Sequence, residues 1–423
     1  MPLNPKRVVA ELEELRSLTS DENGAQRVAW TETWQKARRW FVEKLAGLPV
    51  EHHTDAAGNL WATLRGESEK ALLLGGHLDS VPNGGWLDGP LGTLASLEII
   101  RRFAEEHHGR PPVTIRLVDW ADEEGRFGRS LLGSSAFAGT HSVDADRSRT
   151  DRNGIRMEDA LRACEIEIDR FPEAAREQEN ASVYLELHIE QGPNLESSGL
   201  PLAAVLGTKG VERHAVTFSG RESHAGTTPM DRRHDALAPA AKLALEIRAI
   251  ASKHADAVCT IGSLKTFPGI ATAVVGQCEA TLDQRHLNAA VLASMLRDAQ
   301  EASERFARED GCRVQWLRIW NIQPVPFHPE LIALCEAAIC EIAGQSQRLP
   351  SGALHDAAEV ARAGIPSVMM FVQSLGGISH NKLEDTKREH IELAVHALDR
   401  LAAKTVGWIQ AQLSNSRRVS DCR

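Results

Sequence analysis

Hydrophobic residues follow two different patterns in the first half of the chain, one helical and one typical of buried strands. Val8, Leu12 and Leu15 have the spacing of one helix face, which predicts a helix over 5–18. Runs of consecutive apolar residues, such as LLLGGH, predict strands that are buried on both faces. Strands that alternate with helices are typical of a mostly parallel α/β sheet. The other elements expected in this half are helices over 30–46 and 93–107 and strands over 72–77, 113–124 and 182–192.

The pattern changes near residue 209 and reverts after the segment PVPF. In between, HAVTFSG alternates polar and apolar residues like a half-exposed strand, and CTIGSLKTF and CEATLDQRHL are two further strand-like stretches. Two strands, a helix, two strands and a helix would make a compact α+β unit. We therefore expect one α/β domain, residues 1–209 and 326–423, interrupted by an inserted α+β domain over 210–325. The remaining expected elements are helices over about 233–253, 289–308, 329–343 and 387–413 and a strand over 365–372.

Composition excludes few classes of protein. The formal net charge of -10 disfavours a nucleic-acid partner, because phosphate binding requires clustered Lys and Arg. The seven cysteines form no CxxC pair, so neither a disulfide framework nor a thiolate zinc site is indicated, and a reducing cytoplasm is the expected location. The N-terminal segment has no apolar core of signal-peptide length. No run of about 18 apolar residues predicts a transmembrane helix, so no membrane partner is expected.

A histidine and an aspartate end the first apolar run, in the order His77-Leu78-Asp79. In extended backbone, residues i and i+2 share a face. Asp79 can therefore accept a hydrogen bond from the imidazole of His77 and orient its other nitrogen toward a metal ion. The alternative is a histidine whose hydrogen bonds are satisfied within the core.

Two carboxylate clusters follow. Asp88 stands in the glycine-rich segment NGGWLDGPLG, where it could bridge two cations or form an ordinary turn. Asp122, Glu123 and Glu124 end the run VTIRLVDWADEE, and three adjacent acids repel one another unless positive charge offsets them. A solvated acidic turn is the alternative. In the functional interpretation, one glutamate binds metal and its neighbour takes a proton from water.

Two histidines complete the set. His188 lies in LELHIEQGP, where it is either structural or a ligand, and His380 follows the glycine turn of GGISHNKLED. All five clusters stand at the ends of apolar runs, where open α/β sheets place their active sites. Three imidazoles and two carboxylates suit two borderline divalent cations with open positions for water and substrate. Two such ions about 3.5–4 Å apart can share a hydroxide and polarise a carbonyl group. The expected ligands are His77, Asp88, Glu124, His188 and His380.

With these clusters in this order, the chain resembles the M20 metallopeptidase superfamily. It is most similar to the branch of N-carbamoyl-L-amino-acid hydrolases, β-ureidopropionases and allantoate amidohydrolases. The motifs that carry the resemblance are DENGAQRVAW, DAAGNLW, GGHLDSVPNGGWLDGPLG, DEEGRFG, ELHIEQGP, SHAGTTPMDRRHDAL and GGISHNKLED. The resemblance implies an α/β, mostly parallel-sheet metallohydrolase domain with an inserted α+β domain that is both a lid and the interface of a homodimer.

The resemblance also implies roles for individual residues. One of two Zn, Mn or Co ions would be held by His77, Asp88 and His188, and the other by Asp88, Glu124 and His380. Attack by metal-bound hydroxide would then cleave the C–N bond of a small amide. Glu123 would be the general base, Asp79 would orient His77, and His224 would polarise the carbonyl oxygen. Arg285, His355 and the residue at position 272 would contact the substrate.

The sequence departs from this family's pattern around the expected substrate. Thr272 takes the place of an Asn, Val211 that of a Gln, Leu354 that of a Gly, and Lys382 that of a Pro. Three functions therefore stay open. The first is hydrolysis of an N-carbamoyl amino acid or a related ureido compound. The second is hydrolysis of another amide, an N-acyl amino acid, a dipeptide or an arylamine. The third is a non-catalytic binding protein, which would not need both Glu123 and Glu124.

Overall fold

The computed structural model describes residues 2–421 of the chain, and side chains up to residue 414. These residues divide into two compact units. The larger unit contains the residues up to Leu206 and those from Phe327 on, and the smaller contains Gly207–Pro326. Among the described residues, no helix combines the length and apolar character needed to cross a membrane.

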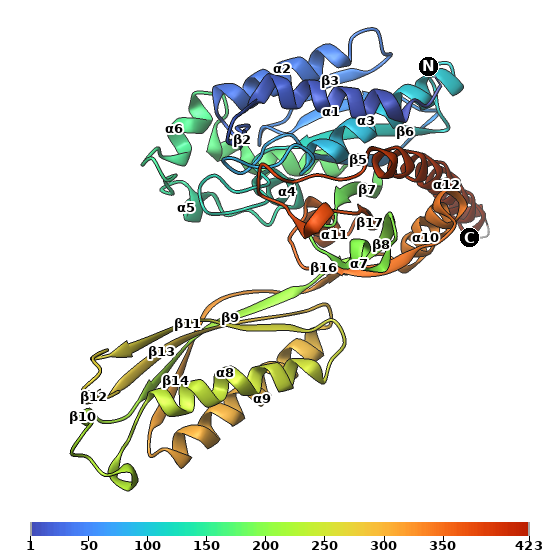
Figure 1. The fold of residues 1–423 in the computed structure, drawn as a ribbon. Helices are drawn as coiled ribbons and strands as arrows, with labels where there is room; N and C mark the ends of the chain where they lie inside the picture. Colours follow the sequence, from blue (N-terminus) through green and yellow to red (C-terminus); the bar gives the residue numbers. More distant parts are fainter. Residues whose placement is uncertain (1, 422–423) are drawn as a thin grey trace. The chain divides into compact units, whose positions relative to one another are not determined.

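The larger unit is built on a mixed sheet with a parallel centre (Figure 1). Its strands follow the order β8-β17-β7-β5-β6-β4-β3, and β16 also pairs with β8. The pairs β17–β7, β7–β5 and β5–β6 are parallel, whereas β6–β4, β4–β3 and β17–β8 are antiparallel. This arrangement confirms the predicted α/β class. The strands are β3 (Glu51–Thr54), β4 (Leu60–Leu64), β5 (Ser68–His77), β6 (Val113–Trp120), β7 (Ala181–Ile189), β8 (Leu202–Thr208), β16 (Gln347–Ser351) and β17 (Ser367–Val372).

Helices cover the sheet, and its central strands are buried along most of their length. Every residue of β6 and β17 is buried. Helices α1, α3 and α12 contact one another, and α3 and α12 pack against the central strands; α4 and α11 form a second contacting pair against them. The helices are α1 (Pro5–Thr19), α2 (Glu32–Lys44), α3 (Pro90–Glu106), α4 (Leu132–Ala138), α5 (Val143–Asp146), α6 (Met157–Arg162), α7 (Asn194–Ser198), α10 (Pro329–Ala343), α11 (Asp356–Arg362) and α12 (Arg388–Asp421), with 3-10 turns η1 (Ile168–Gln178) and η3 (Leu375–Gly377). A short hairpin joins β1 (Ser20–Asp21) to β2 (Gly24–Ala25).

The smaller unit is an antiparallel sheet in the order β11-β13-β9-β14, with two helices on one face. Phe218 and Leu282 from the sheet, Leu243 from α8 and Met295 from α9 share its core. Its elements are β9 (Gly210–Ser219), β10 (Ser223–His224), η2 (Met230–Arg232), α8 (Leu237–Ser252), β11 (Val258–Phe267), β12 (Ala273–Val274), β13 (Gln277–His286), α9 (Ala289–Glu309) and β14 (Arg313–Ile322), followed by β15 (Val325–Pro326), which pairs with the end of β8.

Two expectations about strands were wrong. The strand expected over 113–124 ends at Trp120, because Asp122 adopts a left-handed backbone conformation (φ 56°) and the acids that follow lie in a loop. The pattern of the smaller unit also missed β14, RVQWLRIWNI. Its burial alternates only over its first five residues, and beyond them polar and apolar residues are exposed alike, with a register shift between Arg318 and Trp320.

Candidate active site

The expected ligands come together at one edge of the larger unit. The parallel strands β5, β6, β7 and β17 end at this edge, so the residues at or after their carboxyl ends are neighbours. His77 is the last residue of β5, and His188 is the last but one of β7. Glu123 follows β6, and His380 follows β17.

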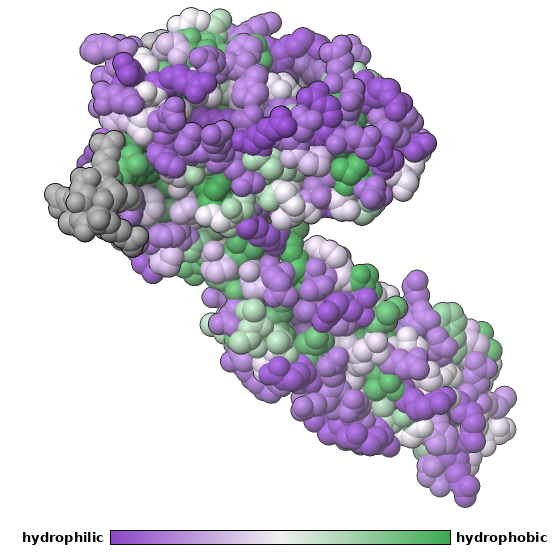
Figure 2. Space-filling model, turned by 180° about the vertical axis from the view of Figure 1, so that it is seen from behind, coloured by the Kyte–Doolittle hydropathy of each residue, from purple (hydrophilic) through white to green (hydrophobic). Residues whose placement is uncertain are grey.

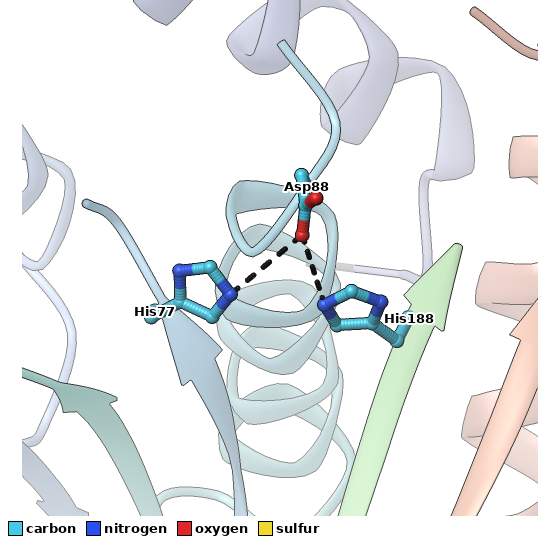
Figure 3. Close-up of side chains that lie close together, drawn as sticks. All are labelled: His77, Asp88 and His188. Carbon is cyan, nitrogen blue, oxygen red and sulfur yellow. Dashed lines mark ion pairs between the residues drawn. The ribbon is translucent and has the colours of Figure 1, made fainter. Parts of the chain in front are cut away.

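Asp88 lies between the two strand histidines (Figure 3). Its Oδ1 atom is 3.1 Å from Nε2 of His188 and 3.8 Å from Nε2 of His77. All three side chains are buried, and one ligand atom from each lies within 4.8 Å of the other two. The hydrogen bond and charge of His188 hold the pKa of Asp88 well below its usual range, although burial acts in the opposite direction. Asp88 is therefore a carboxylate in this site.

The other carboxylate oxygen of Asp88 faces a second group. Oδ2 is 3.4 Å from Nε2 of His380, and the same nitrogen is 3.3 Å from Oε2 of Glu124. These three residues also offer ligand atoms within 4.8 Å of one another. His380 is half exposed, whereas Glu124 is largely buried. One carboxylate thus joins two groups of ligands, each of which includes an imidazole.

Both groups fit metal ions. Nε2 of His77 and Oε1 of Glu124 are buried and have no hydrogen-bond partner among the described residues, although buried polar atoms are normally satisfied. A cation would satisfy both. The donors are imidazole nitrogens and carboxylate oxygens, which suit zinc, manganese or cobalt.

Asp79 fixes the orientation of His77. Nδ1 of His77 lies 3.2 Å from the backbone oxygen of Asp79 and 3.5 Å from its carboxylate, which leaves Nε2 to face Asp88. The carboxylate of Asp79 also accepts hydrogen bonds from the backbone N–H groups of Glu123 and Glu124, at 3.3 and 3.1 Å. The same aspartate therefore positions both the imidazole and the acidic loop after β6.

Glu123 points toward the first group of ligands. Its Oε2 atom is 3.8 Å from Nε2 of His77, and the residue is 8% exposed. Burial raises its pKa well above the ordinary value, and the neighbouring carboxylates of Glu124 and Asp356 add to the shift while His77 opposes it. A raised pKa is consistent with the expected role, because the carboxyl group must take up a proton before it can deliver it.

Three polar residues without an expected role hold Asp88 in place. Its Oδ2 atom accepts hydrogen bonds from Nε2 of Gln191 at 2.8 Å and from the hydroxyl of Ser379 at 2.6 Å. Oε1 of Glu384 accepts the backbone N–H groups of Leu87 and Asp88. Proximity within ELHIEQGP and GGISHNKLED was the only sequence signal for these residues.

Comparisons with known proteins agree with this geometry. The model of peptidase family M20/M25/M40 matches residues 73–404. An N-carbamoyl-L-amino acid amidohydrolase from Geobacillus stearothermophilus is 34% identical over 382 residues, which are 89% of this chain and 92% of that protein. An allantoate amidohydrolase from Escherichia coli (strain K12) is 33% identical over 86% of this chain and 88% of its own. The chain belongs to peptidase family M20/M25/M40.

Solved structures of this family share the fold. The crystal structure of an amidase of the hydantoinase/carbamoylase family from Burkholderia multivorans superposes with a TM-score of 0.84 at 30% identity, over 95% of this chain and 97% of the other. The chain is a hydrolase of the M20 family. Its similarity to other members, which its motifs already indicated, extends over nearly its whole length.

One expected substrate residue of this M20 hydrolase lies behind the ligands. His355 is 1% exposed, its ring is 4.5 Å from that of His188, and its Nε2 is 2.9 Å from the hydroxyl of Ser351. Burial lowers its pKa well below the ordinary value, so the imidazole is neutral. Glu186, His188 and His355 also offer ligand atoms within 4.8 Å of one another. The structure therefore places His355 against a candidate ligand, and its contact with substrate stays a prediction.

The other three expected residues belong to the smaller unit of the M20 hydrolase. His224 on β10 pairs with Ala273 on β12, and the backbone N–H of Ala225 bonds the oxygen of Thr272, so His224 and Thr272 are neighbours. Arg285 is near the end of β13, opposite Val211, and its Nε bonds Asp283 at 2.8 Å.

His224 lies beyond one end of the four-stranded sheet, and Arg285 lies near its other end. β10 and β12 lie beyond the end at which Gln277 pairs with Ser219 (Figure 1). Arg285 is eight residues further along β13, and eight residues of extended strand span about 27 Å.

Proposed function

We propose that this chain hydrolyses a linear C–N bond in an N-carbamoyl amino acid or a related ureido compound that carries a carboxylate. The observation that carries this proposal is the Asp88 carboxylate, which joins two imidazole-containing groups of ligands beside the buried Glu123. The named relatives act on N-carbamoyl-L-amino acids and on allantoate, which supports the substrate class.

The ligands would divide between two ions. His77, Asp88 and His188 would hold one, and Asp88, Glu124 and His380 the other. Two bound divalent cations would polarise the substrate carbonyl and lower the pKa of a water molecule. The sequence and geometry fit zinc, manganese and cobalt equally well.

Glu123 would move the proton. Its carboxylate, held beside His77 and out of bulk water, would accept the proton of the attacking water and deliver it to the departing nitrogen. Asp79 would keep the imidazole of His77 and the loop of Glu123 in register during this transfer. A module that only binds its ligand would have no use for this buried acid beside the ligands, which favours an enzyme over a binding protein.

A homodimer formed through residues 210–325 would complete the site. His224 would polarise the carbonyl and Arg285 would bind the carboxylate, yet Arg285 lies about 27 Å along β13 from Gln277, and His224 lies beyond that end of the strand. A small substrate cannot touch both from one copy of the chain. One of the two residues must therefore come from a second subunit, in keeping with the isologous interface of a two-fold dimer.

The edge strand β11 and helix α8 suit this interface best. α8 packs beside β11. Leu245 on α8 is 72% exposed, and Leu264 on β11 is exposed as well. The other edge, β14, exposes Leu317, Ile319 and Trp320, but its neighbour α9 exposes no large hydrophobic side chain among the described residues. Leu245→Glu should therefore dissociate the dimer in light scattering, and Leu317→Glu is the matched control. If the dimer survives Leu245→Glu and dissociates with Leu317→Glu, the interface lies at β14 instead.

A substrate panel tests the proposed reaction. The metal-loaded enzyme would be assayed for release of the amino acid from N-carbamoyl derivatives of leucine, phenylalanine and glycine, and compared with allantoate, N-acetyl amino acids and dipeptides. We expect an N-carbamoyl compound to give the highest kcat/KM. A clear preference for N-acyl amino acids or dipeptides would replace the proposed substrate class with the second one. No turnover of any compound, with metal bound, would favour a binding protein.

A further inference from the structure

Arg27 is a fully buried cation close to the candidate metal centre. It lies between β2 and α2, in the segment DENGAQRVAW, and is 0% exposed. The proposed reaction gives it no task, since it is neither a ligand nor within a group that could hold a metal ion.

Its hydrogen bonds hold the segment that directly follows His77. Nε donates to the backbone oxygen of Leu78 at 2.8 Å. The backbone N–H of Arg27 donates to the hydroxyl of Ser80, and the backbone N–H of Ser80 donates to the oxygen of Arg27, each at 3.1 Å. Leu78 and Ser80 flank Asp79, the residue that orients His77.

The same guanidinium reaches the segment that ends in Asp88. Nη2 lies 3.4 Å from the backbone oxygen of Gly85, and Nη1 bonds the hydroxyl of Thr19. From the other side, Oε1 of Glu384 accepts the backbone N–H of Asp88. Gly85 fits between them only because it lacks a side chain: a Cβ there would lie 2.0 Å from the Glu384 carboxylate. The segment is thus held between Arg27 and Glu384.

The charge of Arg27 has no direct partner in these contacts. All of its side-chain hydrogen bonds go to neutral oxygens, of Leu78, Gly85 and Thr19. Burial lowers its pKa to about 10, while the more distant carboxylates of Glu384 and Asp79 act in the opposite direction. Burying a cation without a paired carboxylate lowers the free energy of unfolding. If the position had only a structural role, an apolar side chain would stabilise the fold more.

We propose that Arg27 is a positioning residue that sets the spacing of the segments 77–80 and 85–88, and so holds His77 and Asp88 ready for metal. The planar fork of a guanidinium can bond two backbone oxygens at fixed angles, which a lysine ammonium cannot. This inference rests on the proposed metal centre. It predicts that shape, rather than positive charge, is what the site needs at position 27.

The test compares Arg27→Lys and Arg27→Met with wild type in their binding of Mn²⁺. Metal-free protein would be titrated with Mn²⁺ by calorimetry, and the unfolding midpoint recorded with and without the ion. The matched control is Arg101→Lys, another buried arginine, which bonds Glu11 and has no contact with the ligand segments. We expect both Arg27 variants to lose at least about tenfold in Mn²⁺ affinity, the usual size of such effects, and the control to lose stability only.

Each other outcome has a defined meaning. Mn²⁺ affinity within about threefold of wild type in Arg27→Lys would overturn the inference. Tighter Mn²⁺ binding in Arg27→Met alone would also overturn it, because the positive charge of residue 27, rather than its shape, would then control the affinity. If wild type binds no Mn²⁺, the proposed metal centre fails first. If neither Arg27 variant folds, Thr19→Val removes the hydroxyl that accepts a hydrogen bond from Nη1 of the guanidinium. That variant should bind Mn²⁺ several-fold more weakly, and wild-type affinity would count against the inference.

Discussion

The hydroxyl of Ser379 donates a 2.6 Å hydrogen bond to Oδ2 of Asp88, the carboxylate that the two groups of candidate ligands share. The same hydroxyl oxygen is 3.1 Å from Oε2 of Glu384. Burial raises the pKa of Glu384 to about 7, with the charge of Asp88 adding to the shift. A partly buried serine thus lies between a carboxylate that must be charged and one that is half protonated at neutral pH.

Ser379→Ala should weaken metal binding without unfolding the protein. Asp88 would lose one of the two side-chain hydrogen bonds on its Oδ2 atom and would be free to rotate away from its ligand position. Loss of such a supporting bond commonly costs about 10–100-fold in metal affinity. Equilibrium dialysis with metal analysis measures this, and Ser135→Ala, a buried helix hydroxyl that bonds only a backbone oxygen, is the control. Unchanged affinity would show that Gln191 holds Asp88 unaided.

Glu123→Gln should keep both metal ions and nearly abolish turnover. Glutamine has the same shape but cannot accept the proton of water, and loss of a general base costs on the order of 10²–10⁴-fold in rate. The neighbouring substitution Glu124→Gln should instead lower metal content, because Glu124 belongs to a group of ligands. Steady-state kinetics together with metal analysis separate the two effects. Turnover of Glu123→Gln within a few-fold of wild type would exclude Glu123 as the base.

The metal-free protein should become less stable as pH rises from about 5 to 7.5. Burial raises the folded-state pKa of Glu384 to about 7, above its value in an unfolded chain. Over this range the unfolded chain therefore releases a proton that the folded protein retains, and the free energy of unfolding falls. The pKa of His77 is also raised, by Glu123 and Asp79 against the effect of burial, and its contribution is lost in the same direction.

Chemical denaturation of chelator-treated protein at several pH values tests this expectation. Glu384→Gln should show a weaker decline with pH, since the amide does not titrate. Added metal should reverse the trend, because binding requires deprotonated ligands and therefore strengthens as pH rises. Stability of the chelated protein that increases from pH 5 to 7.5 would contradict the prediction.

Mixing two inactive variants should restore activity if the site is shared between subunits. His224→Ala and Arg285→Ala would each inactivate a homodimer. In a mixed dimer, one of the two sites would have both residues intact. Random exchange of equal amounts would therefore restore about a quarter of wild-type activity toward a carboxylate substrate. Mixtures that stay inactive after subunit exchange, or a fully active monomer in light scattering, would show that both residues serve their own chain.

Thr272 and Arg285 should control which substrates are accepted. Threonine offers one hydroxyl where an asparagine would offer two donors and an acceptor, so a substrate that needs the amide would lose a bond of about 0.5–1.5 kcal/mol. Thr272, Val211 and Leu354 together favour a bulkier or more apolar body than that of allantoate. Thr272→Asn should accordingly improve kcat/KM for allantoate relative to N-carbamoyl-phenylalanine. A wild-type enzyme that prefers allantoate would refute this prediction.

Arg285→Lys should raise KM for carboxylate substrates more than for an uncharged amide. The guanidinium already bonds Asp283, so the arginine is held at the end of β13 in a defined orientation. Lysine lacks the planar fork that matches a carboxylate. Arg213→Lys is the matched control, because Arg213 bonds the same Asp283. Equal effects of the two substitutions would point to a structural role for Arg285.

The sequence by itself determined the chemistry of the ligands and the edge at which they stand. Apolar runs such as 72–77 can be buried only as central strands, and their carboxyl ends must share one edge of a parallel sheet. His77, Asp79 and His188 follow from that rule, because their positions relative to the strand ends are local. The alternation of strands and helices determined the α/β class for the same reason.

Only the tertiary structure decided which distant residues support that edge. Ser379, Gln191 and Arg27 contact the ligand segments through the packing of loops that lie far apart in the sequence, and no periodicity encodes such contacts. The structure also decided that His355 is buried behind His188, and that His224 lies beyond the end of the four-stranded sheet opposite to Arg285. Strand pairing fixes those distances, since register between strands depends on partners that the local pattern does not specify.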